Sequence, residues 1–197
     1  MRLTTDQARQ NRQLILETAS RMFRLRGLEG VSVSDIMKEC GFTHGGFYNH
    51  FESKEQLATE AVECAFVQST DTLVKMFEAV DDPQKAFEMV VAAYLSPSYR
   101  DSARGGCPAA AMPTDAARGS EELQRAFAEG VQGYLELFST WMDAGKPEGR
   151  PRAIALLSGL VGALCLSRAI KKSSPKLSEE ILKSARKHFS RESFRKV

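Results

Sequence analysis

Apolar residues recur at helical spacing along most of this chain. In residues 9–25 they share one face of a predicted helix: Leu14, Ile15, Ala19, Met22 and Phe23. The same spacing predicts further helices over the following ranges: 54–66, 83–94, 121–142, 152–171 and 177–189. Residues 96–120 are rich in Pro, Gly and Arg, with a short helix expected at Ala109–Met112, and residues 145–151 predict a loop. No stretch shows convincing strand alternation, so the pattern predicts an all-α fold.

Capping residues divide the first part of the chain into short helices. Gly27 predicts the C-cap of the first helix. Ser32 and Asp35 predict a capping box, in which the serine hydroxyl accepts from the Asp35 N–H and the carboxylate reaches back. That helix ends at Gly41, Thr43 is expected to cap a short third helix, and residues 53–56 form another capping box. Short capped helices separated by a tight break predict a helix-turn-helix.

Composition places the chain among soluble globular proteins. The 197 residues are 43% hydrophobic and 26% charged, which argues against a disordered or collagen-like chain. The formal net charge is only +2, so any nucleic-acid binding must come from a local basic face. The polar start lacks the apolar core of a signal peptide. The longest apolar run, Ala153–Leu166, is shorter than a membrane span needs, so we expect a buried helix and no membrane contact.

The four cysteines do not suggest disulfides or a metal site. They are far apart, with no CxxC spacing, and the chain contains only three histidines. We therefore expect no metal and a cytoplasmic location. Cys40, Cys64 and Cys165 are expected to be inert core residues on apolar helix faces.

The third predicted helix begins with an unfavourable pair of glycines. Gly45 and Gly46 each lower the stability of a helix by up to ~1 kcal/mol relative to alanine. Such a cost is accepted where the backbone must approach something closely, and the major groove of DNA is one such partner. Phe47 and Phe51 are four residues apart and are expected to anchor this helix from within.

The outward-facing residues of this segment suit DNA. His44 and Asn49 can hydrogen-bond base edges, and Tyr48 can reach a phosphate. Thr43 and Lys54 stand at helix N-termini, which favour phosphate oxygens, and Ser32 either caps its helix or contacts a phosphate. Arg2, Arg9 and Arg12 predict a basic arm along the DNA backbone. The candidate DNA-binding residues are Ser32, Thr43, His44, Gly45, Gly46, Tyr48, Asn49 and Lys54.

Residues 41–57, GFTHGGFYNHFESKEQL, resemble the recognition segment of TetR-family transcriptional regulators. Residues 27–36 are similar to that family's second-helix entry, and the likeness covers about residues 8–65. The resemblance implies a homodimer on a roughly palindromic operator, usually a repressor released by a small ligand. Many relatives carry a bulkier residue at the position of Gly46, so base readout here rests more on the backbone.

The resemblance also implies a domain organisation. Residues 1–52 form an N-terminal three-helix DNA-binding module, with the motif at about residues 32–51. A long helix joins it to a larger helical domain, residues 53–197, for effector binding and dimerisation. Aromatic and methionine side chains in the middle of the chain are expected to form core, and some of them an apolar ligand pocket.

Cys107 is a candidate sensor. Pro108 fits the first turn of a helix, which places Cys107 near the N-cap, with Arg100 and Arg104 upstream. The helix dipole and the guanidinium charges favour thiolate over thiol. Some relatives carry a similar Gly-Cys loop, and certain of them sense electrophiles or oxidants there. We hypothesise that modification of Cys107 weakens DNA binding, and the alternative is a small buried cysteine in a tight turn.

Small residues form stripes along the predicted helix 152–171 and allow another helix to approach closely. They predict a dimer interface, with residues 177–189 beside it, and the alternative is a core helix within one chain. The stripe residues are Ala155, Ser158, Gly159, Gly162 and Ala163.

No GxSxG, Walker, HExxH or GxGxxG motif is found, so the sequence predicts no catalytic residues and no cofactor. We interpret the chain as a sequence-specific DNA-binding regulator, more a repressor than an activator. Its expected partners are double-stranded operator DNA, a second copy of the chain and an unknown small-molecule effector. Two other interpretations stay open: a small-molecule-binding protein whose DNA-binding module is vestigial, and an interaction protein that uses DNA as a scaffold.

Overall fold

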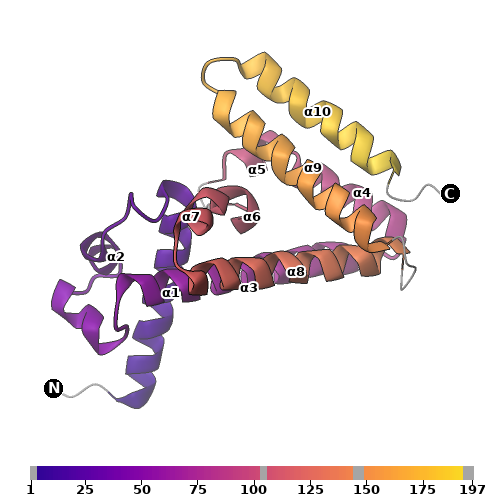
Figure 1. Ribbon diagram of the computed structural model, residues 1–197. Helices are drawn as coiled ribbons and strands as arrows, with labels where there is room; N and C mark the ends of the chain where they lie inside the picture. The colour runs from indigo at the N-terminus through magenta and orange to yellow at the C-terminus, as the bar shows by residue number, and fades with distance from the viewer. Residues whose placement is uncertain (1–3, 103–105, 144–148, 193–197) are drawn as a thin grey trace. The chain divides into compact units, whose positions relative to one another are not determined.

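Helices form every regular element in the parts of the chain that the structure describes, which confirms the all-α prediction (Figure 1). This computed structural model describes residues 4–102, 106–143 and 149–192. Its internal contacts divide the chain into two compact units. The first unit comprises Met1–Gln68 and Ala103–Gly130, and the second comprises Ser69–Ser102 and Val131–Val197. Residues 106–130 thus pack with the N-terminal helices, while the functional boundary after residue 52 stays a prediction.

The first unit contains the predicted helix-turn-helix. Its helices are α1 (Thr5–Arg26), α2 (Val33–Glu39), η1 (His44–Asn49), the start of α3 (Lys54–Glu78), α6 (Pro108–Ala111), α7 (Pro113–Arg118) and the start of α8 (Glu121–Asp143). Gly27 ends α1 with a φ of 74°, and the capping box at Ser32 and Asp35 is present, as expected. At α3, Ser53 Oγ accepts from the Gln56 N–H (3.0 Å). The Gln56 side chain, however, accepts from Glu52 N–H rather than closing the box on Ser53.

The third helix differs from its prediction. Residues 44–49 form a 3₁₀ helix, and Thr43 occupies the N-cap without a side-chain capping hydrogen bond among the described residues. The expectation that Thr43 caps this helix is therefore wrong. Two glycines in a six-residue element disfavour the α-helical turn, and the tighter 3₁₀ form is common in short pieces.

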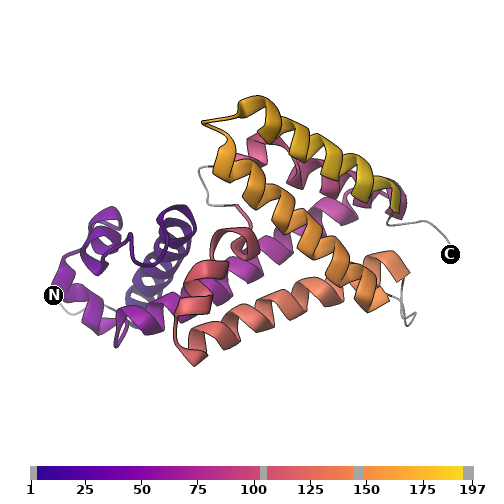
Figure 2. The same ribbon diagram turned by 45° about the horizontal axis from the view of Figure 1, so that its top comes forward.

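The second unit is built around a helical hairpin. Its elements are α4 (Pro83–Tyr94), α5 (Pro97–Arg100), α9 (Gly149–Ile170), α10 (Pro175–Glu192) and the ends of α3 and α8. In both ribbon views α9 and α10 run antiparallel, side by side (Figure 2). Residues 149–151 belong to α9, which corrects the loop expected over 145–151; the rest of that loop, residues 145–148, lies outside the described residues. Pro151 is tolerated there because a first-turn residue donates no helical hydrogen bond.

A polar network holds α5 against α9 and α10. Ser167 and Ser178 are fully buried, with their hydroxyl oxygens 2.7 Å apart. Arg100 Nη1 donates to Ser178 Oγ (2.8 Å), and Asp101 accepts from Arg100 (2.7 Å) and Lys171 (2.6 Å). The hydrogen bond from Arg100, followed by that from Lys171, holds the pKa of Asp101 well below its usual range. The guanidinium of Arg100 is thus committed within the second unit.

Candidate nucleic-acid interface

The inner side of η1 is an aromatic anchor. Phe47 and Phe51 are 0% and 2% exposed, and their rings stack at 5.7 Å. Tyr48 contacts the Phe47 ring edge-on at 5.2 Å but is itself 65% exposed. Burial of two phenylalanines fixes which face of this short helix points outward.

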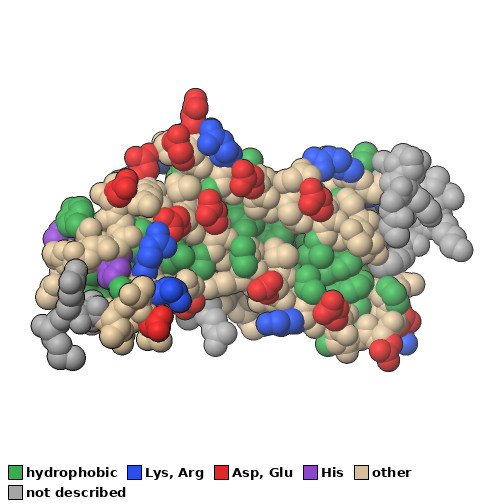
Figure 3. Space-filling view, turned by 90° about the horizontal axis from the view of Figure 1, so that it is seen from below, with side chains coloured by type: hydrophobic (Ala, Val, Ile, Leu, Met, Phe, Trp, Pro, Cys, Tyr) green, Lys and Arg blue, Asp and Glu red, His purple; other side chains and the backbone are tan. Residues whose placement is uncertain are grey.

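The outer side of η1 presents the predicted DNA-contacting groups. Thr43, His44, Gly45, Tyr48 and Asn49 are all exposed. The rings of His44 and Tyr48 meet edge-on at 6.1 Å. In the space-filling view, histidine side chains lie at the surface of the N-terminal module, near Lys and Arg side chains (Figure 3). The structure therefore brings a row of hydrogen-bonding groups together on one exposed side.

The fold itself does not require glycine at position 45. Apart from its own chain neighbours and the nearby helix backbone, no described atom lies within 4 Å of the place that a Cβ on Gly45 would take. Gly46 differs, because a Cβ there would stand 3.6 Å from Met37 Cε and 3.8 Å from Thr43 Oγ1. The positive φ angles found among the described glycines lie elsewhere, at Gly27, Gly41 and Gly106. The absence of a side chain at Gly45 thus leaves bare backbone facing outward.

The two candidate DNA contacts that flank η1 in the sequence, Ser32 and Lys54, have different surroundings. The Ser32 hydroxyl accepts from Asp35 N–H (3.1 Å) and donates to Asp35 Oδ2 (2.6 Å). These hydrogen bonds to Ser32 lower the pKa of the Asp35 carboxyl. Of the two roles expected for Ser32, the structure shows capping. Lys54 is the first residue of α3 and is half-buried beside a cavity of about 310 Å³.

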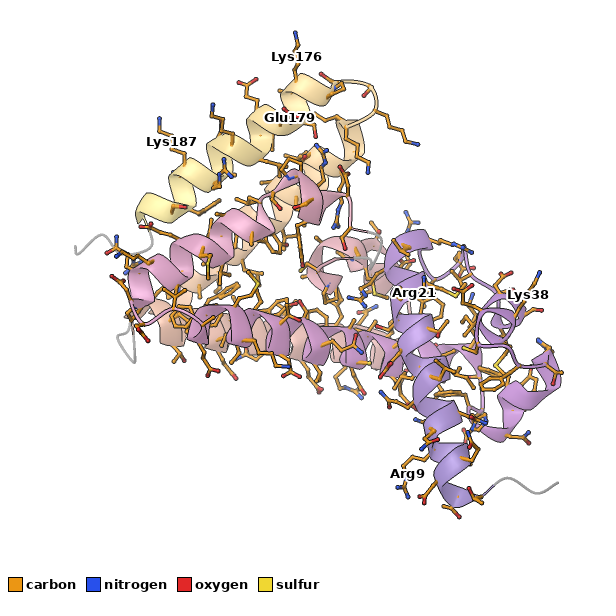
Figure 4. The ribbon with its side chains drawn as sticks, turned by 180° about the vertical axis from the view of Figure 1, so that it is seen from behind. Arg9, Arg21, Lys38, Lys176, Glu179 and Lys187 are labelled. Atoms are coloured by element: carbon orange, nitrogen blue, oxygen red, sulfur yellow. The ribbon has the colours of Figure 1, made fainter. Side chains whose placement is uncertain are left out.

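The predicted basic arm does not form as expected. Arg12 turns inward, where Nε donates to His50 O (3.3 Å), Nη2 donates to Glu60 Oε1 (2.7 Å) and the guanidinium lies 4.3 Å from the centre of the Phe51 ring. Arg9 is exposed near the start of α1 and pairs weakly with Asp6 at 3.6 Å (Figure 4). Arg2 lies outside the described residues.

One exposed cation of the N-terminal module, Lys38, is not among the DNA contacts predicted from the sequence. Lys38 lies in the last turn of α2, exposed to solvent (Figure 4). A count of charges along the short α2 would have found it. Arg21, also on this module, is held by Glu39 at 2.7 Å.

Cys107 stands where its sequence context places it, at the N-cap of α6, but it is buried, with 2% exposure. Arg24 Nη1, from α1, donates to the neighbouring Gly106 O (3.0 Å). Arg104 lies outside the described residues.

The other three cysteines are half-buried, which corrects the expectation that they belong to the core. Burial nevertheless raises the pKa of the Cys40 and Cys64 thiols, an effect that favours the unreactive form.

The small-residue stripe of α9 splits between two faces. Ala155 and Ser158 are exposed, and Gly162 is half-buried, with no described atom within 4 Å of the place that a Cβ would take. Gly159, in contrast, lies directly under the Phe189 ring of α10, and Ala163 is buried at 8% exposure. Packing within the chain therefore explains Gly159 and Ala163.

The outward face of α9 is apolar. Ile154 and Leu166 are 45% and 60% exposed and extend the face formed by Ser158 and Gly162. Among the described helices, α9 is the one long and apolar enough to cross a membrane by length and composition, and 39% of its most apolar window is buried. Core helices of soluble proteins meet the same criteria, so this is weak evidence for a membrane span.

Comparisons with known proteins agree with this geometry. A family model described as "Bacterial regulatory proteins, tetR family" matches residues 15–61. The HTH-type transcriptional regulator LmrA of Bacillus subtilis (strain 168) is 28% identical over 171 residues, which cover 85% of this chain and 91% of LmrA. The HTH-type transcriptional repressor NemR of Escherichia coli (strain K12) is 22% identical over 138 residues, 68% of each chain.

Solved structures share the fold. The reduced form of E. coli NemR matches with a TM-score of 0.76 and 20% identity, covering 91% of this chain and 94% of that chain. A TetR transcriptional regulator from Chloroflexus aurantiacus J-10-FL matches with a TM-score of 0.77 and 23% identity, covering 94% and 95%. The likeness extends over both units of the chain and not only over the helix-turn-helix.

Proposed function

We propose that this chain is a DNA-binding transcriptional regulator of the TetR family, a homodimeric repressor that reads a roughly palindromic operator with two copies of η1. The observation that carries the proposal is the outward side of η1. Gly45 is exposed and bare although the fold leaves room for a side chain, and it stands between hydrogen-bonding residues. Bare backbone at that place allows close approach to the floor of a major groove.

Each exposed group has a proposed role. His44 and Asn49 hydrogen-bond base edges, where the sequence is read. Tyr48, Thr43 and Lys54 contact phosphates and set the position of the module on the duplex. The Thr43 hydroxyl is suited to this role because it does not cap its own helix. Ser32 acts indirectly, since its capping box fixes the start of α2.

The outward face of α9 is the proposed dimer surface. Ala155, Ser158 and Gly162 allow close approach, and the exposed Ile154 and Leu166 supply apolar area to bury. A two-fold dimer presents two recognition helices to half-sites about one turn of DNA apart, on the order of 34 Å. Phosphate contacts from both copies add to affinity and make it depend on salt.

An apolar ligand or modification of Cys107 is the proposed release signal. The solved structure of E. coli NemR, which shares this fold, is of a reduced form, and this supports a redox-sensitive signal here. In this chain Cys107 has too little exposure to accept an added group without opening the turn before α6. An electrophile that bonds to Sγ, with loss of the thiol proton, would therefore favour a state in which α6 leaves α1, and it would shift the population away from the DNA-bound form.

The Cys107 proposal is tested by mass spectrometry during mild alkylation of the free protein. We expect modification of Cys107 to proceed at the rate at which operator binding is lost. Cys107→Ser should keep operator binding and resist release. Reaction at Cys107 no faster than at the three other cysteines would reject it as a sensor.

The same proposal assigns no enzymatic activity, cofactor or metal to the chain and places it in the cytoplasm. Relatives named as transcriptional regulators support this assignment. The competing possibility is a ligand-binding protein with a vestigial DNA module, and it predicts no sequence preference.

The two possibilities separate in a fluorescence anisotropy titration of the full chain on its own upstream intergenic DNA, with a scrambled duplex and a salt series. We expect saturable binding that survives moderate salt only on the native duplex. Equal, salt-sensitive binding to both duplexes would contradict a role as a regulator acting at its own upstream DNA.

A further inference from the structure

A groove in the second unit has no part in the proposed DNA function. It lies between α4 and α10, with a volume of about 590 Å³. Met89, 41% exposed, and Ala92 from α4 supply its apolar surface. The volume falls within the roughly 300–1,000 Å³ of small-ligand clefts.

Cations from both helices surround this apolar surface. Lys183, Arg186 and Lys187 line it from α10, and Lys85 lines it from α4. The α10 cations have the spacing i, i+3 and i+4, so they share one face and repel one another. No ion pair is found for these three within the described ranges, whereas Lys85 lies 4.0 Å from Asp82. The charges of these three cations are therefore not paired within 4 Å by described residues, although Glu179 and Glu180 stand one turn before Lys183 on the same helix.

Acidic groups do little to cancel this charge. Glu88 is the one carboxylate among the groove-lining residues that are described, and its Oε1 accepts from Gln84 Nε2 (3.2 Å). In the sequence from Lys183 to the C-terminus, Glu192 is the single acidic residue. An excess of four cations over one carboxylate beside exposed apolar surface is unusual in a chain whose net charge is only +2.

The groove is also distinct from the proposed dimer surface. On α10 the buried Ser178 and Leu182 mark the side that packs inside the unit. At 100° per residue, Lys183 lies about a third of a turn and Lys187 nearly half a turn away from that side, and Leu177, 47% exposed, lies on a third side. A ligand in the groove would therefore not need to displace a second copy of the chain.

We propose that this groove binds a small anionic amphiphile, a molecule with a carboxylate or phosphate head and an apolar body. The cations of α10 and Lys85 hold the acidic head, with Arg186 offering a planar two-pronged donor. The apolar body covers Met89 and Ala92. The proposal is independent of DNA binding, because none of its residues belongs to the helix-turn-helix.

The test is isothermal titration calorimetry of the full chain with decanoate. We expect saturable binding to the wild type, at least tenfold weaker binding to the double variant Arg186→Gln/Lys187→Gln, and loss of binding to Met89→Glu. Lys176→Gln is the matched control: it removes an exposed α10 cation that does not line the groove, at the opposite end of the helix from Lys187 (Figure 4), and should bind as the wild type does.

Three further probes separate the sources of any signal. Decanol tests the apolar body alone, inorganic phosphate tests the charge alone, and vesicles of phosphatidylglycerol test a membrane surface. We expect weak or undetectable binding to each. Equal affinity for decanol or for phosphate, binding only to vesicles, or an equal loss in Lys176→Gln would overturn the proposal.

Discussion

A single guanidinium, that of Arg12, joins three segments of the N-terminal module. It donates a hydrogen bond to His50 O at the end of η1 and forms an ion pair with Glu60 of α3. It also lies over the face of the Phe51 ring. The two charged side chains of the ion pair are 38% and 25% exposed, so solvent screening limits its strength. The sequence could show that Arg12 is basic, but the partners that turn it inward are 38 and 48 residues away.

Arg12→Gln should therefore lower the free energy of unfolding by about 1–2 kcal/mol, from the lost ion pair and cation–π contact. Urea unfolding measures this change. The salt dependence of DNA binding should be unchanged, because the guanidinium of Arg12 is engaged by His50 O, Glu60 and Phe51. Lys54→Ala is the contrasting variant, with near-wild-type stability and a salt slope reduced by ~0.9. A flatter slope for Arg12→Gln would show that Arg12 touches DNA after all.

His50 makes stability depend on pH in the neutral to mildly acidic range. Burial, with a smaller effect of the Arg12 charge, lowers the pKa of His50 below its ordinary value of about 6.5. The unfolded chain then takes up its proton at a higher pH than the folded chain. The contribution of His50 to the free energy of unfolding is complete above about pH 6.5. It is lost as the pH falls from there through the pKa of His50 in the folded chain.

Urea unfolding at pH 7.5 and 5.5 tests this sign. The wild type should lose more stability between these pH values than His50→Gln, which carries no titrating group at this position. An equal loss in both proteins would place the pH sensitivity elsewhere.

At the scale of elements, two glycines three residues apart on α9 should behave in opposite ways. A methyl group on Gly159 would collide with the Phe189 ring, so Gly159→Ala should lower the free energy of unfolding by about 1–3 kcal/mol. Gly162 has open space, so Gly162→Ala should be neutral or stabilising by up to about 1 kcal/mol.

The same position tests the dimer surface. Gly162→Arg has room in a single chain but places a charge in the proposed interface. Sedimentation velocity should then show monomer for Gly162→Arg and dimer for Gly162→Ala. Dimers formed equally well by both variants would remove α9 from the interface.

Which elements could be predicted depended on their length. Long helices such as α8 and α10 carry several apolar repeats and are predicted within a few residues at each end, but α3 runs to Glu78, well beyond the end predicted for it at residue 66. α5 and α7 span only four and six residues, too short for a periodic signal, although each begins at a proline that fits a first turn. The 3₁₀ form of η1 was also missed, because propensity rules describe the α-helix.

At the scale of the whole molecule, the candidate site was easier to predict than the packing around it. The exposed row of η1 follows from local spacing, with Phe47 and Phe51 turned inward. The burial of Cys107 and the covering of Gly159 by Phe189 depend on segments distant in sequence. Local patterns carry no information on such contacts.

The most direct test of DNA recognition by η1 is a paired measurement on Gly45→Leu. The free energy of unfolding should stay within about 0.5 kcal/mol of the wild type, since a Cβ at this exposed position meets open space. The dissociation constant for the native upstream duplex should rise at least tenfold, equivalent to about 1.4 kcal/mol. Gly133→Leu, at a position in α8 where a Cβ also meets open space, is the control: it should leave the dissociation constant unchanged and be neutral or stabilising by up to about 1 kcal/mol. Wild-type affinity in a folded Gly45→Leu variant would contradict the claim that η1 lies against the DNA.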